Sequence, residues 1–191
     1  TPEKIPEKLR PFGQSYSLCV QDLGEEAVQV LGQRGGYISP PAEEQENEFS
    51  FGSSLSFLGE NIPYWFYISG NGLEKQQIPL LGQMEKQIED YIEDNIGRCN
   101  SVVSEFSLQG FSIKKKVDAK ADVKIRQDEV TVKLVMPFNL QLDDSKARVD
   151  TYIINVQKAL GKSYEAARKI IEAENAQLFL EERTIDVLSI Y

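Results

Sequence analysis

The sequence predicts an α+β domain in which an antiparallel β-meander sheet packs against two or three amphipathic helices, with one disulfide. Three observations support this fold class. Apolar and polar residues alternate over 113–126 and again over 130–142, as in a half-buried sheet. Apolar residues recur every three or four positions over 16–31 and 79–97, as on one face of a helix. One of the two cysteines lies in the first of these stripes, and the other lies at the end of the second.

Composition limits the functions that the chain can have. Its 191 residues are 41% hydrophobic, which is enough to bury a core, and its formal net charge is -9. Nucleic acid is not an expected partner, because binding a phosphate backbone needs a concentrated positive surface. The chain has no histidine, and so it lacks the commonest general base and metal ligand. No apolar run is long enough to span a membrane.

Residues 1–12 are expected to form an extended stalk or linker, and residues 13–191 a single domain. The segment TPEKIPEKLRP contains three prolines and alternating charges, which disfavour packing into a core. A stalk suggests a membrane anchor upstream, and a plain disordered terminus is the alternative.

The first half of the domain is expected to begin with a helix from Tyr16 to about Gly32, which stops at the sequence GQRGG. A short strand at 37–38 would follow. Residues 39–61, with two adjacent prolines and the acidic run EEQENE, predict a long surface loop with one edge strand at 49–57. The aromatic segment 64–68 precedes an Asn-Gly turn signal and predicts a buried strand.

The clearest prediction is the hairpin formed by 113–126 and 130–142. Both strands face one core only if odd-numbered residues of the first strand pair with even-numbered residues of the second. A short turn at Gln127 and Asp128 meets this condition. The resulting pairs are Ile125 with Val130, Val123 with Val132, Ala121 with Leu134, Val117 with Phe138 and, on the outer face, Asp122 with Lys133.

The last third of the chain predicts one more strand and one more helix. Thr151–Val156 is expected as the third strand of the meander, and Asp143 and Asp144 as a turn before it. A helix is then expected from Ser163, as its N-cap, to Glu181. The apolar ending TIDVLSIY suggests a truncated C-terminus, with more protein following natively.

The two cysteines admit two interpretations. Cys19 and Cys99 could be inert buried thiols, which is a common state for cysteine, or they could form a disulfide, which we favour. A disulfide would tie the two helices together and indicate an oxidising compartment. A redox-active pair is not expected without Cys-x-x-Cys spacing, and two cysteines without histidine cannot form a zinc site.

No catalytic, cofactor-binding or metal-binding residues are expected, so the chain is predicted not to be an enzyme. The acidic residues Glu25, Glu26, Glu85, Glu89 and Glu93 occupy polar helix faces and are interpreted as solvated. The candidate partner-binding residues come from a basic strand face and from an aromatic segment. They are Lys114, Lys116, Lys120, Lys124, Arg126, Tyr64, Trp65 and Tyr67. The alternatives are that the lysines protect a sheet from aggregation and that the aromatic residues belong to the core.

Four segments carry a resemblance to known proteins. They are SYSLCVQDLGEEAVQVLGQRGGYI, IPYWFY, IPLLGQMEKQIEDYIEDNIGRC and VDAKADVKIRQDEVTVKLVMPF. In this order they resemble uncharacterised membrane-anchored extracytoplasmic proteins of archaea. In those proteins a hydrophobic N-terminal anchor, sometimes pilin-like, precedes a cysteine-bearing helix that ends in Leu-Gly-x-x-Gly-Gly-Tyr-Ile. The resemblance implies a matched pair of Cys19 and Cys99 and a domain on the outer side of the membrane.

We therefore expect a non-enzymatic extracytoplasmic domain of a membrane-anchored cell-surface protein, which serves in surface assembly or partner binding. Its partners would be other surface proteins or further copies of itself. The alternative is a ligand- or glycan-binding module that uses the aromatic segment 64–67 and the loop 39–61.

Overall fold

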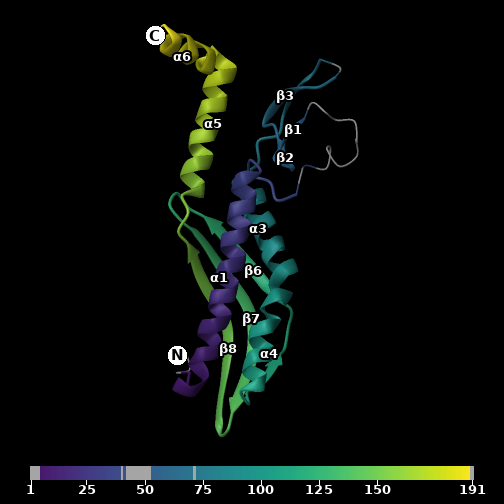
Figure 1. The fold of residues 1–191 in the computed structure, drawn as a ribbon, viewed down its shortest axis with the longest axis vertical. Coiled ribbons are helices and arrows are strands. Elements are labelled where there is room, and N and C mark those ends of the chain that lie inside the picture. Colours follow the sequence, from purple (N-terminus) through teal and green to yellow (C-terminus); the bar gives the residue numbers. More distant parts are fainter. Residues whose placement is uncertain (1–4, 40, 42–52, 71, 190–191) are drawn as a thin grey trace.

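The computed structural model describes residues 5–39, 41, 53–70 and 72–189. The predicted fold class is confirmed, because helices cover an antiparallel sheet in an elongated body (Figure 1). A helical arm, α5 followed by α6, leaves one end of this body (Figure 1). No helix in the described part of the chain is long and apolar enough to cross a membrane.

The helices and strands follow one another in a simple order. They are η1 (Glu7–Leu9), α1 (Arg10–Gln33), β1 (Ser54–Phe57), β2 (Glu60–Pro63), β3 (Phe66–Ile68), β4 (Glu74–Gln76), α3 (Leu81–Asn95), η2 (Ile96–Cys99), α4 (Asn100–Leu108), β5 (Ser112–Lys115), β6 (Lys120–Ile125), β7 (Val130–Leu142), β8 (Ser145–Val156), α5 (Leu160–Gln177) and α6 (Phe179–Leu188).

The main sheet is built around β7. β5 and β6 pair with successive parts of one side of β7, and β8 pairs with the other side, all antiparallel. The predicted register between β6 and β7 is confirmed from Ile125 opposite Val130 to Ala121 opposite Leu134, with Asp122 opposite Lys133. β8 contains the predicted third strand and begins earlier, at Ser145, directly after the predicted turn at 143–144.

The predicted pairing of Val117 with Phe138 is wrong. Residues 116–119 leave the ladder between β5 and β6, and Phe138 lies opposite Lys115 instead. Val117 is 60% exposed. The register is shifted by two residues, which keeps odd numbers opposite even numbers, so the same faces of both strands still point to the core.

The expected N-terminal stalk is wrong for residues 5–12. Residues 7–9 form a 3-10 turn, α1 begins at Arg10, and Leu9 is fully buried. The prolines do not hinder this, because Pro11 lies in the first turn of α1, where a backbone N–H has no helical partner. The prolines of this segment therefore help to start a helix that packs into the core.

The segment between α1 and α3 also differs from its prediction. Residues 37–38 form no strand, and 64–68 is not a buried strand. Two small hairpins are present instead, β1 with β2 and β3 with β4, and their strands are largely exposed. Most of the predicted loop 39–61 and the start of the predicted strand 49–57 lie outside the described residues.

The last helix begins earlier and ends differently from its prediction. α5 starts at Leu160, so Ser163 lies inside the helix and is not its N-cap. The start of α5 packs against the β6–β7 turn, where Lys162 N–H donates a hydrogen bond to the Gln127 carbonyl. At Leu178, φ is 52°, and this left-handed residue separates α5 from α6.

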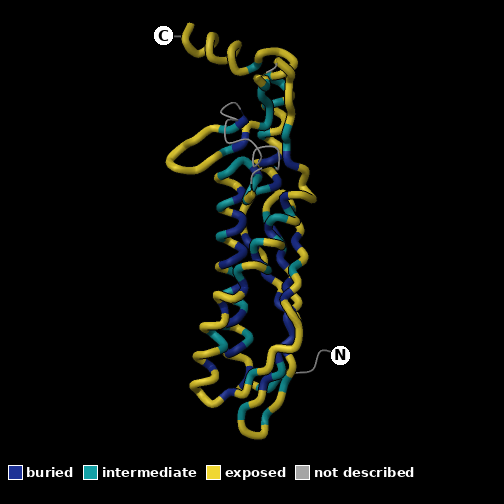
Figure 2. Tube along the Cα trace, turned by 90° about the vertical axis from the view of Figure 1, so that its right-hand side faces the viewer, coloured by how far each residue is buried: buried dark blue, intermediate teal, exposed yellow. Residues whose placement is uncertain are grey.

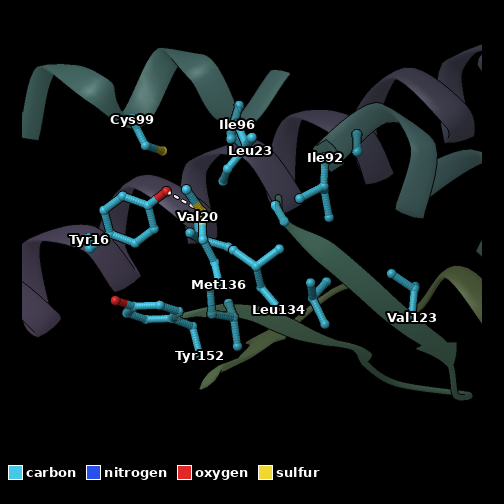
Figure 3. Close-up of a cluster of buried hydrophobic side chains, with 14 of the residues drawn as sticks. Tyr16, Val20, Leu23, Ile92, Ile96, Cys99, Val123, Leu134, Met136 and Tyr152 are labelled. Atoms are coloured by element: carbon cyan, nitrogen blue, oxygen red, sulfur yellow. Dashed lines mark hydrogen bonds between the residues drawn. The ribbon is translucent and has the colours of Figure 1, made fainter. Parts of the chain in front are cut away.

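The core lies between the inner face of the sheet and helices α1, α3 and α4 (Figures 1 and 2). An aromatic cluster joins the layers, and Figure 3 shows part of it: Tyr16 of α1 donates a hydrogen bond to the sulfur of Met136, while the Tyr152 ring lies beneath it. Phe12 packs edge-on against both Phe106 and Phe138. These contacts fix α1 against β7 and β8, and α4 against α1.

Candidate functional site

The described residues contain no candidate metal centre and no free thiol. No group of three or more acidic or cysteine side chains in that part of the chain could hold a metal ion. Both cysteines are joined in a disulfide, so neither is a nucleophile. The candidate sites predicted from the sequence are surfaces, whose polar groups either bond within the chain or remain available to a partner.

The disulfide joins Cys19 of α1 to Cys99 of η2, with a Cα–Cα distance of 5.9 Å, which confirms the predicted pair. Cys99 is fully buried. A second link lies nearby, because Glu26 accepts hydrogen bonds from the Tyr91 hydroxyl at 2.8 Å and from Arg98 at 2.6 Å. The Tyr91 hydrogen bond, together with Arg98, lowers the pKa of Glu26. Glu26 was expected to be solvated, and it instead ties α1 to α3 and to η2.

The acidic face of α3 is not simply solvated either. Glu85, Glu89 and Glu93 accept hydrogen bonds from the backbone N–H groups of Ile125, Val123 and Ala121, at 3.0, 3.1 and 2.9 Å. These three carboxylate side chains are only 17–19% exposed. They satisfy the outer edge of β6, which would otherwise present unpaired N–H groups to water or to another strand.

The match between helix and strand has a simple geometric cause. Four residues of helix rise about 6 Å, and two residues of strand rise about 6.7 Å. Glutamates spaced four apart can therefore each reach an alternate residue of an antiparallel neighbouring strand. Burial raises the pKa of Glu93, but the Ala121 N–H and the Lys120 ammonium together outweigh it and lower the pKa.

The basic residues predicted to bind a partner do not form one continuous surface. Lys120 and Lys124 form ion pairs with Glu93 and Glu85, at 3.0 and 3.1 Å, and Arg126 pairs with Glu129. The other two candidates lie elsewhere: Lys114 is on β5, and Lys116 is in the break that follows it. Lys114 lines an open hollow of about 460 Å³ on the outer face of the sheet, together with Lys146 and Arg148.

The aromatic residues predicted to bind a partner also differ in their roles. The Trp65 indole N–H donates a hydrogen bond to the Gly35 carbonyl at 2.7 Å, and its ring lies 5.8 Å from that of Tyr164. Trp65 therefore holds the end of α1 and the base of α5 together. Tyr64 is exposed and Tyr67 is half-buried. Glycan binding by this segment stays a prediction.

Two further surfaces were not found from the sequence. The first is a groove of about 720 Å³ between α1 and β8, lined by Leu18 of α1 and Ile153 of β8 among others. The second is the arm, whose base is fixed by a hydrogen bond from the Tyr164 hydroxyl to the Pro79 carbonyl. Beyond that base, the arm exposes many large apolar side chains. They are Ile170, Leu178, Leu180, Ile185, Val187 and Leu188.

Sequence signals for these surfaces exist but are incomplete. The apolar residues of the arm are visible in the sequence, but a helical stripe normally indicates a buried face, and no local pattern shows that this one is not covered. Whether β8 is an edge strand depends on the order of strands in the sheet, which the alternation of residues does not reveal.

No family model, no curated protein and no solved structure matches this chain. The resemblance to archaeal membrane-anchored proteins therefore stays a prediction. Any function assigned to the chain rests on its own residues and geometry.

Proposed function

We propose that this chain is a non-enzymatic extracytoplasmic domain of a membrane-anchored cell-surface protein, and that it serves in surface assembly or partner binding. The observation that carries the proposal is the α5–α6 arm, which leaves the body and exposes apolar residues along its length (Figures 1 and 2).

The arm lacks the burial that normally stabilises helices. α6 has 10 residues and buries none of them, and α5 has 18 residues and buries only Gly161 and Tyr164, both near its start. Isolated helices of about 12–15 residues or fewer are marginal in water, and most helical stability in proteins comes from packing an apolar face. A partner that covers the apolar residues of the arm would supply this packing, and such exposed apolar surface is typical of interaction sites.

The extracytoplasmic placement rests on the disulfide. Cys19 and Cys99 join two helices of the core, and such structural disulfides form and persist in oxidising compartments. The non-enzymatic assignment rests on how the ionisable groups are used. The least exposed carboxylates of α3 accept backbone hydrogen bonds from β6, and Glu26 accepts two hydrogen bonds from Tyr91 and Arg98.

The placement is tested by labelling intact source cells with a membrane-impermeant amine reagent and isolating the protein under denaturing conditions with thiol alkylation. We expect surface labelling, no alkylation before reduction and two alkylated cysteines after it. A protein that is protected from the reagent until the cells are lysed, with two free thiols, would contradict the proposal.

The role of the arm is tested with the native full-length protein carrying Ile185→Asp. Val117→Asp is the matched control, because Val117 is 60% exposed and Ile185 66% exposed. We expect the Ile185 variant to leave the native assembly, measured by native gel electrophoresis of detergent extracts, and the Val117 variant to remain in it. Equal migration of both variants and the parent protein would argue against the arm as a binding surface.

A further inference from the structure

The two outer edges of the main sheet differ in what lies against their backbone groups. Along β6, the glutamates of α3 accept hydrogen bonds from the edge N–H groups. Along β8, α1 runs beside the strand but leaves the open groove between them. Natural proteins usually protect sheet edges from pairing with another chain. The β6 part of one edge is protected and the β8 edge is open, which suggests that the open edge has a pairing partner.

The alternation of hydrogen bonds in antiparallel ladders shows which groups of β8 point outward. Val123 directs its N–H to α3 and therefore exchanges no hydrogen bonds with Val132, its partner in β7. Val132 must then direct its N–H and C=O to the other side, where Ile154 of β8 lies opposite. By alternation, the residues between those that bond to β7 point their backbone groups outward. They are Thr151, Ile153 and Asn155, and outside the β7–β8 ladder none of the hydrogen bonds among the described residues uses their N–H groups.

The groove beside this edge is open and has a volume of about 720 Å³. Gly13 and Ser17 of α1 line it, and a Cβ added to Gly13 would meet nothing within 4 Å. Two large apolar residues border it and are exposed: Leu18 of α1 at 62% and Ile153 of β8 at 68%. Pairing at this edge would therefore satisfy backbone groups and also cover apolar surface.

We propose that a second copy of this chain binds at this edge, with the two β8 strands antiparallel across a two-fold axis at Ile153. The two sheets then join into one continuous sheet. This inference deepens the proposed assembly function by naming one partner, and it rests on that function.

The segment around Ile153 is complementary to itself. In a pairing centred there, Thr151 faces Asn155 of the second copy, and Tyr152 faces Ile154 of the second copy. Odd-numbered residues meet odd-numbered ones and even meet even, so the core-facing sides of both strands lie on the same side of the joined sheet. A two-fold contact of this kind satisfies the same backbone groups in both copies at once.

No charged side chain lies within the paired segment. The nearest ones are Asp150, three positions from the centre, and Arg148 and Lys158, each five positions from it, and Arg148 bonds to Asp150 at 2.6 Å. No like charges therefore face each other within the segment 151–155. The Ile153 side chains of the two copies would lie opposite each other, and β-branched residues are favourable neighbours on a sheet.

The first experiment is a charge exchange at the two-fold axis. Sedimentation velocity of the parent protein at about 100 μM, a concentration that detects the weaker interfaces of standard size, should give twice the 21.6 kDa mass of the chain. Ile153→Lys and Ile153→Glu should each weaken dimerisation at least tenfold, because each places like charges opposite each other. An equimolar mixture of the two variants should recover the dimer. Ile153→Val keeps the backbone and the branched side chain and should dimerise like the parent.

The second experiment tests the register. The α-carbons of a hydrogen-bonded antiparallel pair lie about 5.5 Å apart, which suits a disulfide. Ile153→Cys should therefore give a covalent dimer on mild oxidation. Thr151→Cys alone should not, but a mixture of Thr151→Cys and Asn155→Cys should, as measured on non-reducing gels. Circular dichroism confirms that each variant is folded.

Two outcomes overturn the inference: a parent protein that remains at 21.6 kDa, or a dimer that neither Ile153→Lys nor Ile153→Glu weakens. Either failure is separate from failure of the proposed function, which the Ile185→Asp variant tests in the native assembly. If the Ile185 variant leaves that assembly while the purified protein gives either of these two outcomes, the assembly role stands and the pairing of β8 strands falls.

Discussion

The carboxylates of α3 should stabilise the fold by satisfying the edge of β6, and Glu89→Ala is the sharpest test. Glu89 accepts a hydrogen bond from Val123 N–H at 3.1 Å, and Val123 is fully buried. Removing the carboxylate leaves this N–H with poor access to water. Hydrogen bonds to charged groups contribute about 1.5–3 kcal/mol, so we expect the free energy of unfolding to fall by about 2 kcal/mol.

Two companion variants separate the causes of this loss. Glu89→Gln keeps an acceptor oxygen but removes the charge, and neutral hydrogen bonds are roughly half as strong, so we expect a loss of about 1 kcal/mol. Asp90→Ala is the control, because Asp90 is the neighbouring acidic residue and contacts the same lysine, Lys86, as Glu89 does. Asp90 is exposed, and its loss should change the free energy of unfolding by no more than about 0.5 kcal/mol.

Urea denaturation at neutral pH, followed by circular dichroism, measures these differences. With an m-value of about 2.5 kcal/mol/M, a loss of 2 kcal/mol lowers the midpoint by about 0.8 M. The reasoning is refuted if Glu89→Ala and Asp90→Ala have the same midpoint. An equal loss for Glu89→Gln and Glu89→Ala would show that the charge, and not the acceptor, is what matters.

Three further predictions concern other parts of the fold. Reducing the Cys19–Cys99 disulfide, which closes a separation of 80 residues, should lower the free energy of unfolding by roughly 4 kcal/mol, measured by urea titration of oxidised and reduced protein. Tyr152→Phe should raise the free energy of unfolding by about 1 kcal/mol, because the buried hydroxyl has no hydrogen-bond partner among the described residues. A lower melting temperature would contradict this. Gly161→Ala should lower the free energy of unfolding by more than about 2 kcal/mol, because the added Cβ would collide with the backbone of the β6–β7 turn. At Gly82 the added Cβ meets open space, so Gly82→Ala should raise the free energy of unfolding by up to ~1 kcal/mol.

The sheet register could be predicted from the sequence because a buried face imposes a parity on the paired residues. This held from Ile125 to Ala121. It failed at Val117, because the prediction assumed an unbroken strand, whereas residues 116–119 leave the ladder. A shift by two residues preserves the parity, so alternation alone cannot distinguish the two registers.

The role of the α3 glutamates could not be read from amphipathic spacing. Such a pattern identifies the polar face of a helix but not what lies against that face. Glu85 and Glu93 were interpreted as solvated, yet they lie beside the edge of β6. The spacing of four residues along α3, opposite a strand with alternate outward N–H groups, was the available signal. It becomes informative only once the helix and the strand are known to be neighbours.

For the N-terminal segment, the local composition led to a wrong prediction. Its prolines and charges predicted a stalk, but Leu9 and Phe12 are fully buried. Proline disfavours a helix interior and is tolerated in the first turn, so the same residue is compatible with both outcomes. The disulfide could be predicted better, because Cys19 and Cys99 both fell at the buried faces of helices that had to pack on one sheet.

Salt should distinguish pairing of β8 edges from association driven by the exposed lysines. Each copy carries a net charge of -9, so two copies repel each other, and raising the ionic strength from 0.15 to 1 M shortens the screening length from about 8 to about 3 Å. The backbone hydrogen bonds and the Ile153 contact carry no net charge, so screening removes the repulsion and leaves the attraction. Edge pairing should therefore tighten with salt in sedimentation experiments. Association of lysines with acidic surfaces of another copy should weaken instead, and a dimer that dissociates at 1 M salt would assign the contact to charges rather than to the open edge of β8.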